Sequence, residues 1–418
     1  MIVIVGAGVA GLTAARVLFK ARQPFLVFER ESVPGGRVRT DVTHDGFRLD
    51  RGFQVLFTRY SAVRRYLDLK QLGLRTVPGG AVIMGPDGRR DELDDPIRVP
   101  GKVWKTLRSP VLTLADKGRL ALEAADLRLR MAEGIWTDRD TTTHAYLHQR
   151  GFSDDAIERF FRPLFGSIFM DRSLSTSSNA FRFTCKMLAE GETAVPALGM
   201  GELARQLAAP LPPTTLRCGQ PVDELLYADG RVAGVRSGGE ETLADGVIVC
   251  AEAPAAARLT QLPQLADAVG VTTAYFAGSM AVTEEKRLFL NGSPTGLVSQ
   301  ALQISNVAPE YAPPGEHLLS VTVLGARSES DADVEARARA DLAGWFGDAV
   351  MSAQRLISLS RISFGQFPQP PGFAATLPPV RSGVARLYNG GEATRASSIN
   401  GAMEAGEAAA QAALDDLR

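Results

Sequence analysis

The sequence predicts an α/β fold built from two interleaved domains, and three features support this prediction. The first is a β–α–β pattern with a glycine-rich turn over residues 2–29. The second is a series of short strands with hairpin signals between about residues 214 and 250. The third is a strand and an alanine-rich helix over residues 384–418, which predict a return of the chain to the first sheet.

The composition is that of an ordinary folded protein. Of 418 residues, 45% are hydrophobic and 22% are charged, and 46 Lys and Arg balance 47 Asp and Glu. Wholesale disorder is therefore excluded, and nucleic acid is not an expected partner. Cys185, Cys218 and Cys250 are widely spaced, which favours reduced thiols in a cytoplasmic protein. We expect no secretory signal and no spanning helix.

The first β–α–β unit carries a dinucleotide-binding signature. Ile2–Val5 is an apolar run typical of a buried parallel strand. The turn Gly6–Gly11 has the form G-x-G-x-x-G and leads into a helix over Leu12–Phe19. The second strand, Phe25–Glu29, ends in an acidic residue at the distance that this signature requires.

Each position of the turn has a physical role in this interpretation. Gly6 permits a tight turn, Gly8 lets a pyrophosphate approach the backbone, and Gly11 lets the helix pack closely on the strand. Val9 and Ala10 would offer their amides to phosphate at the positive end of the helix dipole. A glycine-rich turn without any ligand is the alternative.

Glu29 is the predicted partner of the adenosine ribose hydroxyls. A carboxylate there repels a 2′-phosphate and so disfavours NADP, although the neighbouring Arg30 would favour one. Gly35 and Gly36 then precede Arg37, whose guanidinium could bind a pyrophosphate through two hydrogen bonds.

These motifs together resemble the flavin amine oxidase superfamily, which includes amine oxidases, protoporphyrinogen oxidase and phytoene desaturase-like oxidoreductases. The resemblance implies FAD as the cofactor and a Rossmann-type FAD-binding domain with a β-meander, interleaved with an α+β substrate domain. The β–α–β unit alone does not separate FAD from NAD.

The end of the chain resembles the closing segment of the same family. The resemblance implies that Gly391 and Glu392 meet the pyrophosphate–ribityl region. It also implies that the helix opening with Ser398, Ile399 and Ala402 points its N-terminus at the flavin pyrimidine, where negative charge develops on reduction. An ordinary strand–loop–helix is the alternative for this segment.

Three further segments match the family. Asp50–Gln54 resembles the loop that approaches the flavin ring, with Gly52 and Phe53 as contacts. Val222 matches the residue whose backbone meets adenine, and Arg162–Phe169 matches a segment that lines the substrate cavity.

The domain boundaries follow from this organisation. We expect residues 1–75, 195–260 and 380–418 to form the FAD-binding domain, and 76–194 and 261–379 the substrate domain. Residues 60–190 read mainly as helices, including Leu114–Arg130, whereas the later strands are expected at Val271–Val282, Leu318–Leu324 and Leu356–Ile362.

The predicted activity is removal of a hydride from a hydrophobic substrate by an FAD-dependent desaturase or oxidase. The phenylalanines Phe53, Phe165, Phe169 and Phe367 suggest an apolar cavity for an isoprenoid or carotenoid-like molecule. A flavin amine oxidase and a non-catalytic FAD-binding carrier are the alternatives. A second nicotinamide site is not expected, because Gly199–Ala204 reads as an ordinary helix start.

No catalytic residue is established by the sequence. In many family members a lysine is hydrogen-bonded through a water molecule to flavin N5, and Lys286 is nominated for this role. Tyr388 is a candidate wall of an amine cage or, equally, a core residue of the last strand. Gln54 or Arg51 could orient a substrate, and Arg51 could instead pair with a phosphate or with Asp50.

Two remaining patterns concern metals and membranes. His144 and His148 share a helix face but have no evident third ligand, so no metal site is expected. The basic, partly apolar segment 98–115 could touch an anionic membrane surface, with a solvated helix pair as the alternative. Nothing in the sequence indicates which oligomeric state the protein adopts.

Overall fold

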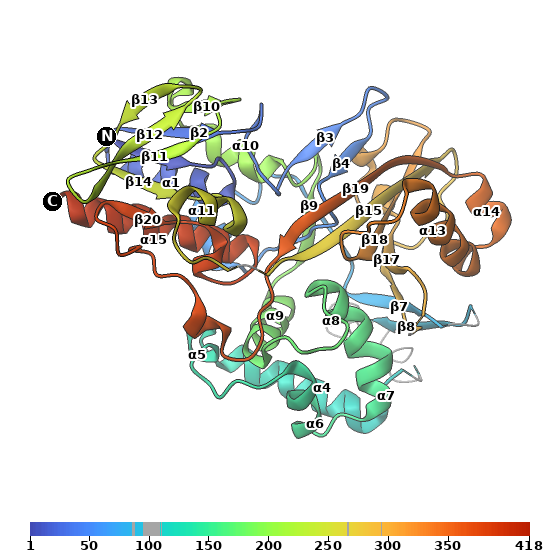
Figure 1. Ribbon diagram of the computed structural model, residues 1–418. Helices are drawn as coiled ribbons and strands as arrows, with labels where there is room; N and C mark the ends of the chain where they lie inside the picture. The colour runs from blue at the N-terminus through green and yellow to red at the C-terminus, as the bar shows by residue number, and fades with distance from the viewer. Residues whose placement is uncertain (86–87, 95–108, 110, 266, 294) are drawn as a thin grey trace.

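The computed structural model describes residues 1–85, 88–94, 109, 111–265, 267–293 and 295–418. One lobe contains a parallel sheet and both ends of the described chain, a second lobe contains a larger mixed sheet, and a layer of helices lies below the space between them (Figure 1). The fold is α/β, as the sequence predicts.

The first lobe is organised around a five-stranded parallel sheet. Its strands, in spatial order, are β10 (Leu216–Cys218), β2 (Phe25–Glu29), β1 (Ile2–Val5), β14 (Gly246–Val249) and β20 (Leu387–Asn389). The strand order reverses direction between β1 and β14, and in such sheets ligands bind beyond the carboxyl ends at that point. The predicted first, second and last strands are confirmed, although β20 is shorter than expected.

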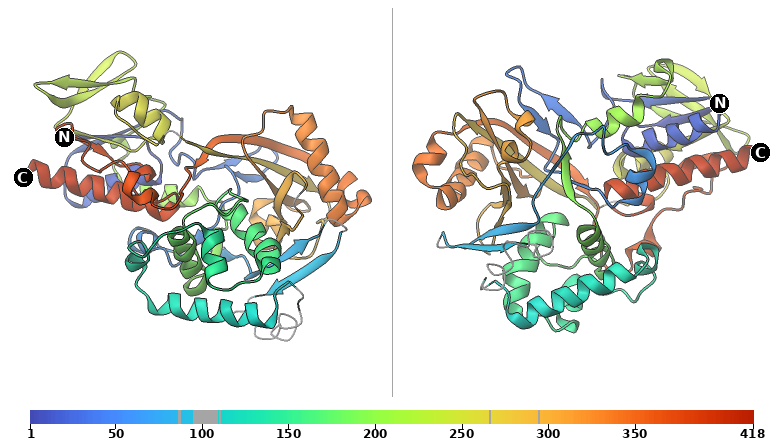
Figure 2. Two further views of the ribbon diagram at one scale, coloured as in Figure 1. Left: turned by 60° about the horizontal axis from the view of Figure 1, so that its bottom comes forward. Right: turned by 180° about the vertical axis from the view of Figure 1, so that it is seen from behind.

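Two long helices pack together against this sheet. They are α1 (Val9–Lys20) and α15 (Ile399–Leu417). A Cβ on Gly406 would lie 2.0 Å from the Ala10 carbonyl oxygen, so only glycine permits their crossing. This packing brings the beginning and the end of the chain side by side (Figures 1 and 2).

The smaller elements of this lobe follow the predicted order. The meander consists of β11 (Glu224–Ala228), β12 (Arg231–Ser237) and β13 (Glu240–Leu243), and is antiparallel as expected. The helix α10 (Glu202–Ala208) begins within the predicted helix start Gly199–Ala204, and α11 (Ala253–Thr260) follows β14.

The second lobe contains a seven-stranded mixed sheet. Its order is β19 (Arg355–Gln366), β15 (Val269–Gly278), β18 (His317–Leu324), β17 (Val298–Leu302), β16 (Leu288–Asn291), β7 (Gly80–Met84) and β8 (Arg90–Asp94). The three strands predicted after residue 270 are confirmed. The mainly helical interpretation of residues 60–190 was wrong for β7 and β8, because β7 is completed by a parallel pairing with β16 that no local pattern indicates.

Helices surround this sheet on its outer side and below. The outer group is α12 (Ile304–Val307), α13 (Asp331–Phe346) and α14 (Asp348–Ser352). The lower layer is α4 (Leu114–Leu129), α5 (Ala132–Ile135), α6 (Thr143–Gln149), α7 (Asp154–Ala156), α8 (Arg162–Ile168) and α9 (Ser178–Glu190). The side chains of Thr113 and Ser153 cap α4 and α7, and a π-helical turn over Ile157–Phe161 joins α7 to α8.

Short strands connect the two lobes. They form the hairpin β3 (Thr40–Val42) and β4 (Arg48–Asp50), and the sheet β5 (Leu56–Phe57), β9 (Thr193–Pro196) and β6 (Leu74–Thr76), with α2 (Ser61–Tyr66) beside them. The five-stranded sheet thus draws on three separate stretches of chain. The domain boundaries predicted from the sequence stay a prediction. The strand order of the five-stranded sheet is compatible with them.

No helix among the described residues combines the length and apolar character needed to cross a bilayer. Of the segment 98–115 that the sequence assigns to a membrane surface, residues 98–108 and 110 lie outside the described residues. The three cysteines are all free thiols, and no cluster of three metal-ligating side chains occurs in the described part of the chain.

Candidate cofactor and substrate site

One cavity of about 1800 Å³ extends from the carboxyl ends of β1 and β2 to the helical layer. Glycines, backbone amides and charged side chains form one end, which we call the nucleotide end. Aromatic side chains form the other, which we call the aromatic end. The predicted cofactor residues that line the cavity are Gly6, Gly8, Val9, Ala10, Glu29, Arg30, Gly35, Gly36, Arg37, Gly52, Phe53, Val222, Glu392, Ser398, Ile399 and Ala402.

The first turn of α1 forms the floor of the nucleotide end. Gly6 has φ +100°, a conformation that favours glycine, and Gly8 is the N-cap residue without a side-chain cap. A Cβ on Gly8 would meet no protein atom within 4 Å, so space is open directly above the first-turn amides. An uncapped helix N-terminus beside open space is a binding site for an anion.

Gly11 has a different role from Gly8. It does not line the cavity, and a Cβ there would lie 1.9 Å from the Gly6 carbonyl oxygen. This supports the packing role that the sequence assigns to it, rather than direct contact with a ligand. Gly391 likewise lies outside the lining, and a Cβ there would lie 2.8 Å from the Ala251 carbonyl oxygen.

Glu29 is buried at the end of β2 and held by the backbone. Its two carboxylate oxygens accept hydrogen bonds from the amides of Ala7 at 2.7 Å and Glu31 at 2.9 Å. Each carboxylate oxygen can accept a second bond, so the group keeps capacity for hydroxyls in the cavity. Arg30 also lines the cavity but is exposed, 3.5 Å from Glu31.

An ion pair joins the two remote motifs. Arg37 Nη1 lies 2.6 Å from Glu392 Oε1 and donates to the Gly365 carbonyl at 3.0 Å. Its guanidinium also lies over the Phe364 ring, 5.4 Å from the centroid. Burial favours the neutral form of Arg37, but Glu392 outweighs this and raises the pKa, so Arg37 remains a cation. The sequence predicted both residues but not their contact.

The loop that follows β4 is anchored by the buried carboxylate of Asp50. This group accepts hydrogen bonds from the Thr40 hydroxyl, the Met200 amide at 2.9 Å and the Tyr311 hydroxyl at 2.7 Å. The Tyr275 hydroxyl donates to its backbone carbonyl at 2.9 Å. Burial raises the pKa of Asp50 to about 6, although these hydrogen bonds oppose the rise. Asp50 therefore connects both lobes just before the cavity wall begins.

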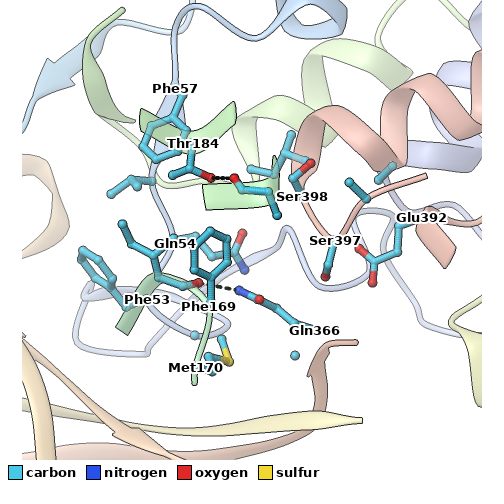
Figure 3. A pocket seen from close by; sticks show the side chains of 18 of the residues that line it. Phe53, Gln54, Phe57, Phe169, Met170, Thr184, Gln366, Glu392, Ser397 and Ser398 are labelled. Carbon is cyan, nitrogen blue, oxygen red and sulfur yellow. Dashed lines mark hydrogen bonds between the residues drawn. The ribbon is translucent and has the colours of Figure 1, made fainter. Parts of the chain in front are cut away.

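Gln54 continues this loop into the cavity. Its side-chain amide donates to the carbonyls of Arg37 and Arg51, both at 2.8 Å, so it braces the loop from within. Arg51 pairs with Asp41 at 3.3 Å and not with Asp50, one of the alternatives open to it, because the donors named above surround the Asp50 carboxylate. Figure 3 shows Phe53 and Gln54 on the wall opposite Ser397 and Ser398.

The first turn of α15 completes the nucleotide end. Ser398 is its N-cap, and the Ser398 hydroxyl accepts a hydrogen bond from the Gly401 amide at 2.9 Å. Ser397, Ser398, Ile399 and Ala402 all line the cavity. Two helix N-termini, from α1 and α15, therefore open onto the same space.

The aromatic end is built from elements far apart in sequence. Its aromatic lining residues are Phe53, Phe57, Tyr60, Trp136, Phe152, Phe160, Phe161, Phe165, Phe169, Phe181 and Phe183. Phe165 and Phe181 form an edge-to-face pair with centroids 4.5 Å apart. The side-chain amide of Gln366 donates a hydrogen bond to the Ile168 carbonyl at 2.8 Å (Figure 3), so one of its two N–H donors is already used within the protein.

Three nominated residues lie elsewhere. Lys286 is exposed and outside the cavity lining; the adjacent Arg287 takes the inward position in an ion-paired cluster, so the Lys286 prediction was wrong. Tyr388 is a buried core residue whose hydroxyl donates to Asp416 at 2.9 Å, which supports the core alternative. Phe367 packs in the core near Phe373 and does not reach the cavity.

Sequence reasoning missed one wall of the cavity. The inner side of α4 contributes Leu120, Ala124 and Leu127, and Trp136, the residue directly after α5, adds an aromatic ring. The amphipathic pattern of Leu114–Arg130 was recognised, but a pattern gives the apolar side of a helix and not what that side faces.

Comparison with known proteins decides the family. The model of the flavin containing amine oxidoreductase family matches residues 9–414. The chain belongs to this family. The resemblance inferred from the glycine motifs is confirmed, and the chain is a flavin-containing oxidoreductase.

Solved structures agree in fold. A protein from Exiguobacterium sp. 255-15, provisionally named protoporphyrinogen oxidase, is 19% identical, with a TM-score of 0.75 over 100% of this chain and 98% of that one. Cyclohexylamine oxidase from Brevibacterium oxydans is 16% identical, with a TM-score of 0.73 over 100% and 99%. At these identities the likeness establishes the fold alone.

One curated relative matches only a short stretch. Phytoene dehydrogenase from Streptomyces griseus is 51% identical over 55 residues, which are 13% of this chain and 11% of that enzyme. The matched stretch is therefore a small part of both proteins.

Proposed function

We propose that this protein is an FAD-dependent oxidoreductase that removes a hydride from a hydrophobic substrate, as a desaturase or an oxidase does. One observation carries the proposal: a single cavity joins an anion-binding end, made by two helix N-termini, to a wall of aromatic side chains. The first end suits a dinucleotide and the second an apolar molecule.

The residues present fit FAD. The open space above Gly8 and the uncapped first turn of α1 would receive the pyrophosphate, with Arg37 as a second source of positive charge. Glu29 would accept the ribose hydroxyls, and Val222 would meet adenine at the rim. The α15 N-terminus would face the flavin pyrimidine.

Bound FAD would supply the hydride acceptor. The chain itself would position and shield the reaction. The α15 N-terminus would stabilise negative charge that develops in front of Ser398 and Ile399. Phe53 and Phe169 would exclude water and hold the substrate, and Gln54 would keep the loop in place.

The aromatic end favours a long apolar substrate such as an isoprenoid or a carotenoid-like molecule. Its wall offers aromatic rings from several elements, and its glutamine side chains at positions 54 and 366 already donate to backbone carbonyls. The short similarity to a phytoene dehydrogenase supports the same substrate class.

An amine is the second candidate substrate, and one observation favours it. Tyr60 and Phe183, both in the lining, have nearly parallel rings with centroids 6.3 Å apart and an interplanar angle of 14°. Aromatic faces attract cationic groups. The fold likeness to cyclohexylamine oxidase supports this alternative.

A visible spectrum and an anaerobic titration test the proposal. The purified protein should be yellow, heat should release FAD, and a carotene or other isoprenoid should bleach the flavin. Bleaching by amines alone would support the second candidate. A protein that binds an apolar ligand but is bleached by no amine, porphyrinogen or isoprenoid would be a carrier, and a colourless protein that ignores added FAD would overturn the proposal.

A further inference from the structure

The seven-stranded sheet contributes a further side of the cavity, which we call the sheet face. Its lining residues include Ala81 on β7, Val271 on β15, Leu288 on β16, Gln300 on β17 and Ile362 on β19. The strand β17 is central, with three strands on each side of it. The other four side chains are aliphatic, so Gln300 places a primary amide in the middle of an apolar surface.

The side chain of Gln300 is buried but poorly satisfied. The residue is 6% exposed, whereas glutamines mostly lie on the surface. Its Nε2 donates to Thr322 Oγ1 at 3.4 Å, which is long for a hydrogen bond. Within the described part of the chain, its Oε1 accepts no hydrogen bond. Because an amide removed from water costs free energy unless it is bonded, we expect a partner for it in the cavity.

The pairing of neighbouring strands extends this polar group into a row. Gln300 lies opposite Thr322 on β18, and Thr322 lies opposite Thr273 on β15. Residues directly opposite each other project to the same face of a sheet. Thr273 Oγ1 is buried and has no hydrogen-bond partner among the residues that the structure describes. We call these three side chains the amide row, and both of its ends have unused hydrogen-bonding capacity.

A β-bulge fixes the position of Gln300. The register of β17 shifts between Val298 and Gln300, so Ser299 is an extra residue in this strand. The Ser299 hydroxyl lies 2.8 Å from the hydroxyl of Ser167, a cavity-lining residue of α8. The helix α8 lies below the sheet in Figure 1. Bulges commonly direct a side chain next to a binding site, and this one is anchored to the opposite side of the cavity.

The two charged side chains that the described strands of this sheet contribute to the lining already have ionic partners. Asp94 on β8 lies 3.0 Å from Arg287, and Arg361 on β19 lies 2.5 Å from Asp331. Both β8 and β19 are edge strands, whereas Gln300 is central. The middle of the sheet face therefore favours a neutral hydrogen-bonding group over an ionic one.

A hydroxyl group is the neutral partner that suits this amide. A primary amide carries an acceptor oxygen and donor N–H groups, and it can turn by 180° to present either of them. A hydroxyl both donates and accepts, so it can bond to the amide in either orientation. A hydrocarbon does neither and would leave the buried amide unpaired, which is how a polar site rejects an apolar analogue.

We propose that Gln300 binds a hydroxyl group of the ligand, so that the cavity selects an apolar alcohol over a hydrocarbon of the same skeleton. The identification of that alcohol as the substrate rests on the proposed function, whereas its binding rests on the amide row alone. Gln300 is then a specificity-determining residue, and the aromatic end holds the apolar part of the same molecule.

Two probes of one skeleton test this preference. They are farnesol, an isoprenoid alcohol, and farnesene, a hydrocarbon, and their binding to the holoenzyme is followed by quenching of tryptophan fluorescence, since Trp136 lines the cavity. The variant Gln300→Met keeps the length of the side chain and removes the amide. It should bind farnesol about tenfold more weakly and farnesene within about twofold of the wild type. Its flavin content should not change.

A matched control carries the same substitution elsewhere. The side chain of Gln206 on α10 bonds to the backbone of Asp68 and lies outside the lining, so Gln206→Met should bind both probes like the wild type. Equal losses for farnesol and farnesene in Gln300→Met would indicate a change of cavity shape. Unchanged farnesol binding would mean that water alone satisfies the amide. Either result, or an equal loss of farnesol binding in Gln206→Met, would overturn the proposal.

A third probe needs no variant. Farnesyl methyl ether accepts a hydrogen bond but cannot donate one, and its added methyl group favours burial. The wild type should nevertheless bind it several-fold more weakly than farnesol. Equal or tighter binding of the ether would overturn the proposal even if Gln300→Met did not fold.

The inference and the proposed function fail in different ways. Binding of the probes requires no redox turnover. If farnesol binding depends on Gln300 but no isoprenoid or amine bleaches the flavin, the hydroxyl site stands and the proposed function fails. If hydrocarbons bleach the flavin and Gln300→Met leaves the affinity for farnesol unchanged, the proposed function stands and the hydroxyl site is overturned.

Discussion

The two ends of the cavity are built in different ways. At the nucleotide end, backbone amides and glycines form the surface, and the open space exists because side chains are missing at Gly8 and Gly36. At the aromatic end, side chains from helices and loops far apart in the chain form the surface. A side chain added at the first end would fill the space that a ligand needs, whereas the second end can change shape by substitution. We infer that the aromatic end sets specificity.

The largest effect is expected for Gly11→Val, which tests the nucleotide end as a packed structure. The new Cβ would lie 1.9 Å from the Gly6 carbonyl oxygen, a backbone atom that cannot move aside. The free energy of unfolding should fall by more than about 3 kcal/mol, measured by urea denaturation. The control is Gly344→Val on α13, where a Cβ meets nothing within 4 Å. Equal midpoints for the two variants would contradict the packing role of Gly11.

Asp50 connects the two lobes just outside the cavity, and Asp50→Asn tests that connection. Because the folded pKa of about 6 exceeds the ordinary 3.8, the folded state binds the proton more tightly. The contribution of Asp50 to stability therefore falls as pH rises from about 4 to 6, by at most about 3 kcal/mol.

Asparagine does not titrate, so the unfolding free energy of the variant should lack the decrease between pH 4 and 6 that Asp50 causes in the wild type. The measurement is the difference between the unfolding free energies of wild type and variant at each pH, since other carboxylates titrate alike in both. A difference that stays constant from pH 4 to 7 would show that Asp50 does not titrate in this range.

Gly8→Val separates binding from folding at the nucleotide end. The side chain would clash with no protein atom but would fill the space above the first turn of α1. Affinity of the apoprotein for FAD should fall on the order of 100-fold, seen by calorimetric titration, while its thermal midpoint without FAD stays near the wild-type value. A variant that retains FAD with wild-type affinity would place the pyrophosphate elsewhere.

The smallest effect is expected for Phe169→Ala at the aromatic end. Flavin content should not change, whereas KM for an apolar substrate should rise about tenfold as a contact surface is lost. Phe346→Ala is the control, because Phe346 is a partly buried aromatic residue that packs on Phe289 outside the cavity. Loss of flavin from the Phe169→Ala variant would mean that the aromatic end also contributes to cofactor binding.

The same contrast explains what the sequence could predict. The strand β1, the turn Gly6–Gly11 and Glu29 form one local unit, in which each residue type answers a backbone requirement. The closing strand and helix were readable for the same reason. The pairing of Arg37 with Glu392 was not, because it joins residues 355 positions apart.

The aromatic end was predicted only in part. Phe165 and Phe169 were found from a family segment, but Trp136 and the inner side of α4 were not. Phe367 and Lys286 were misplaced because strand and loop register decide which of two neighbouring side chains faces inward, and that register is set by distant partners.

The position of β20 has a consequence for biosynthesis. The edge strand of the first sheet and the helix that covers α1 come from residues 387–417, whereas β1 is made first. During translation β1 can pair early with β2 on one edge, but its other edge must wait for β14, which is synthesised about 240 residues later, and β14 in turn waits for β20. Until then one edge of β1 and the surface of α1 that α15 covers are exposed, so the nascent polypeptide carries an unpaired apolar strand edge through much of its synthesis.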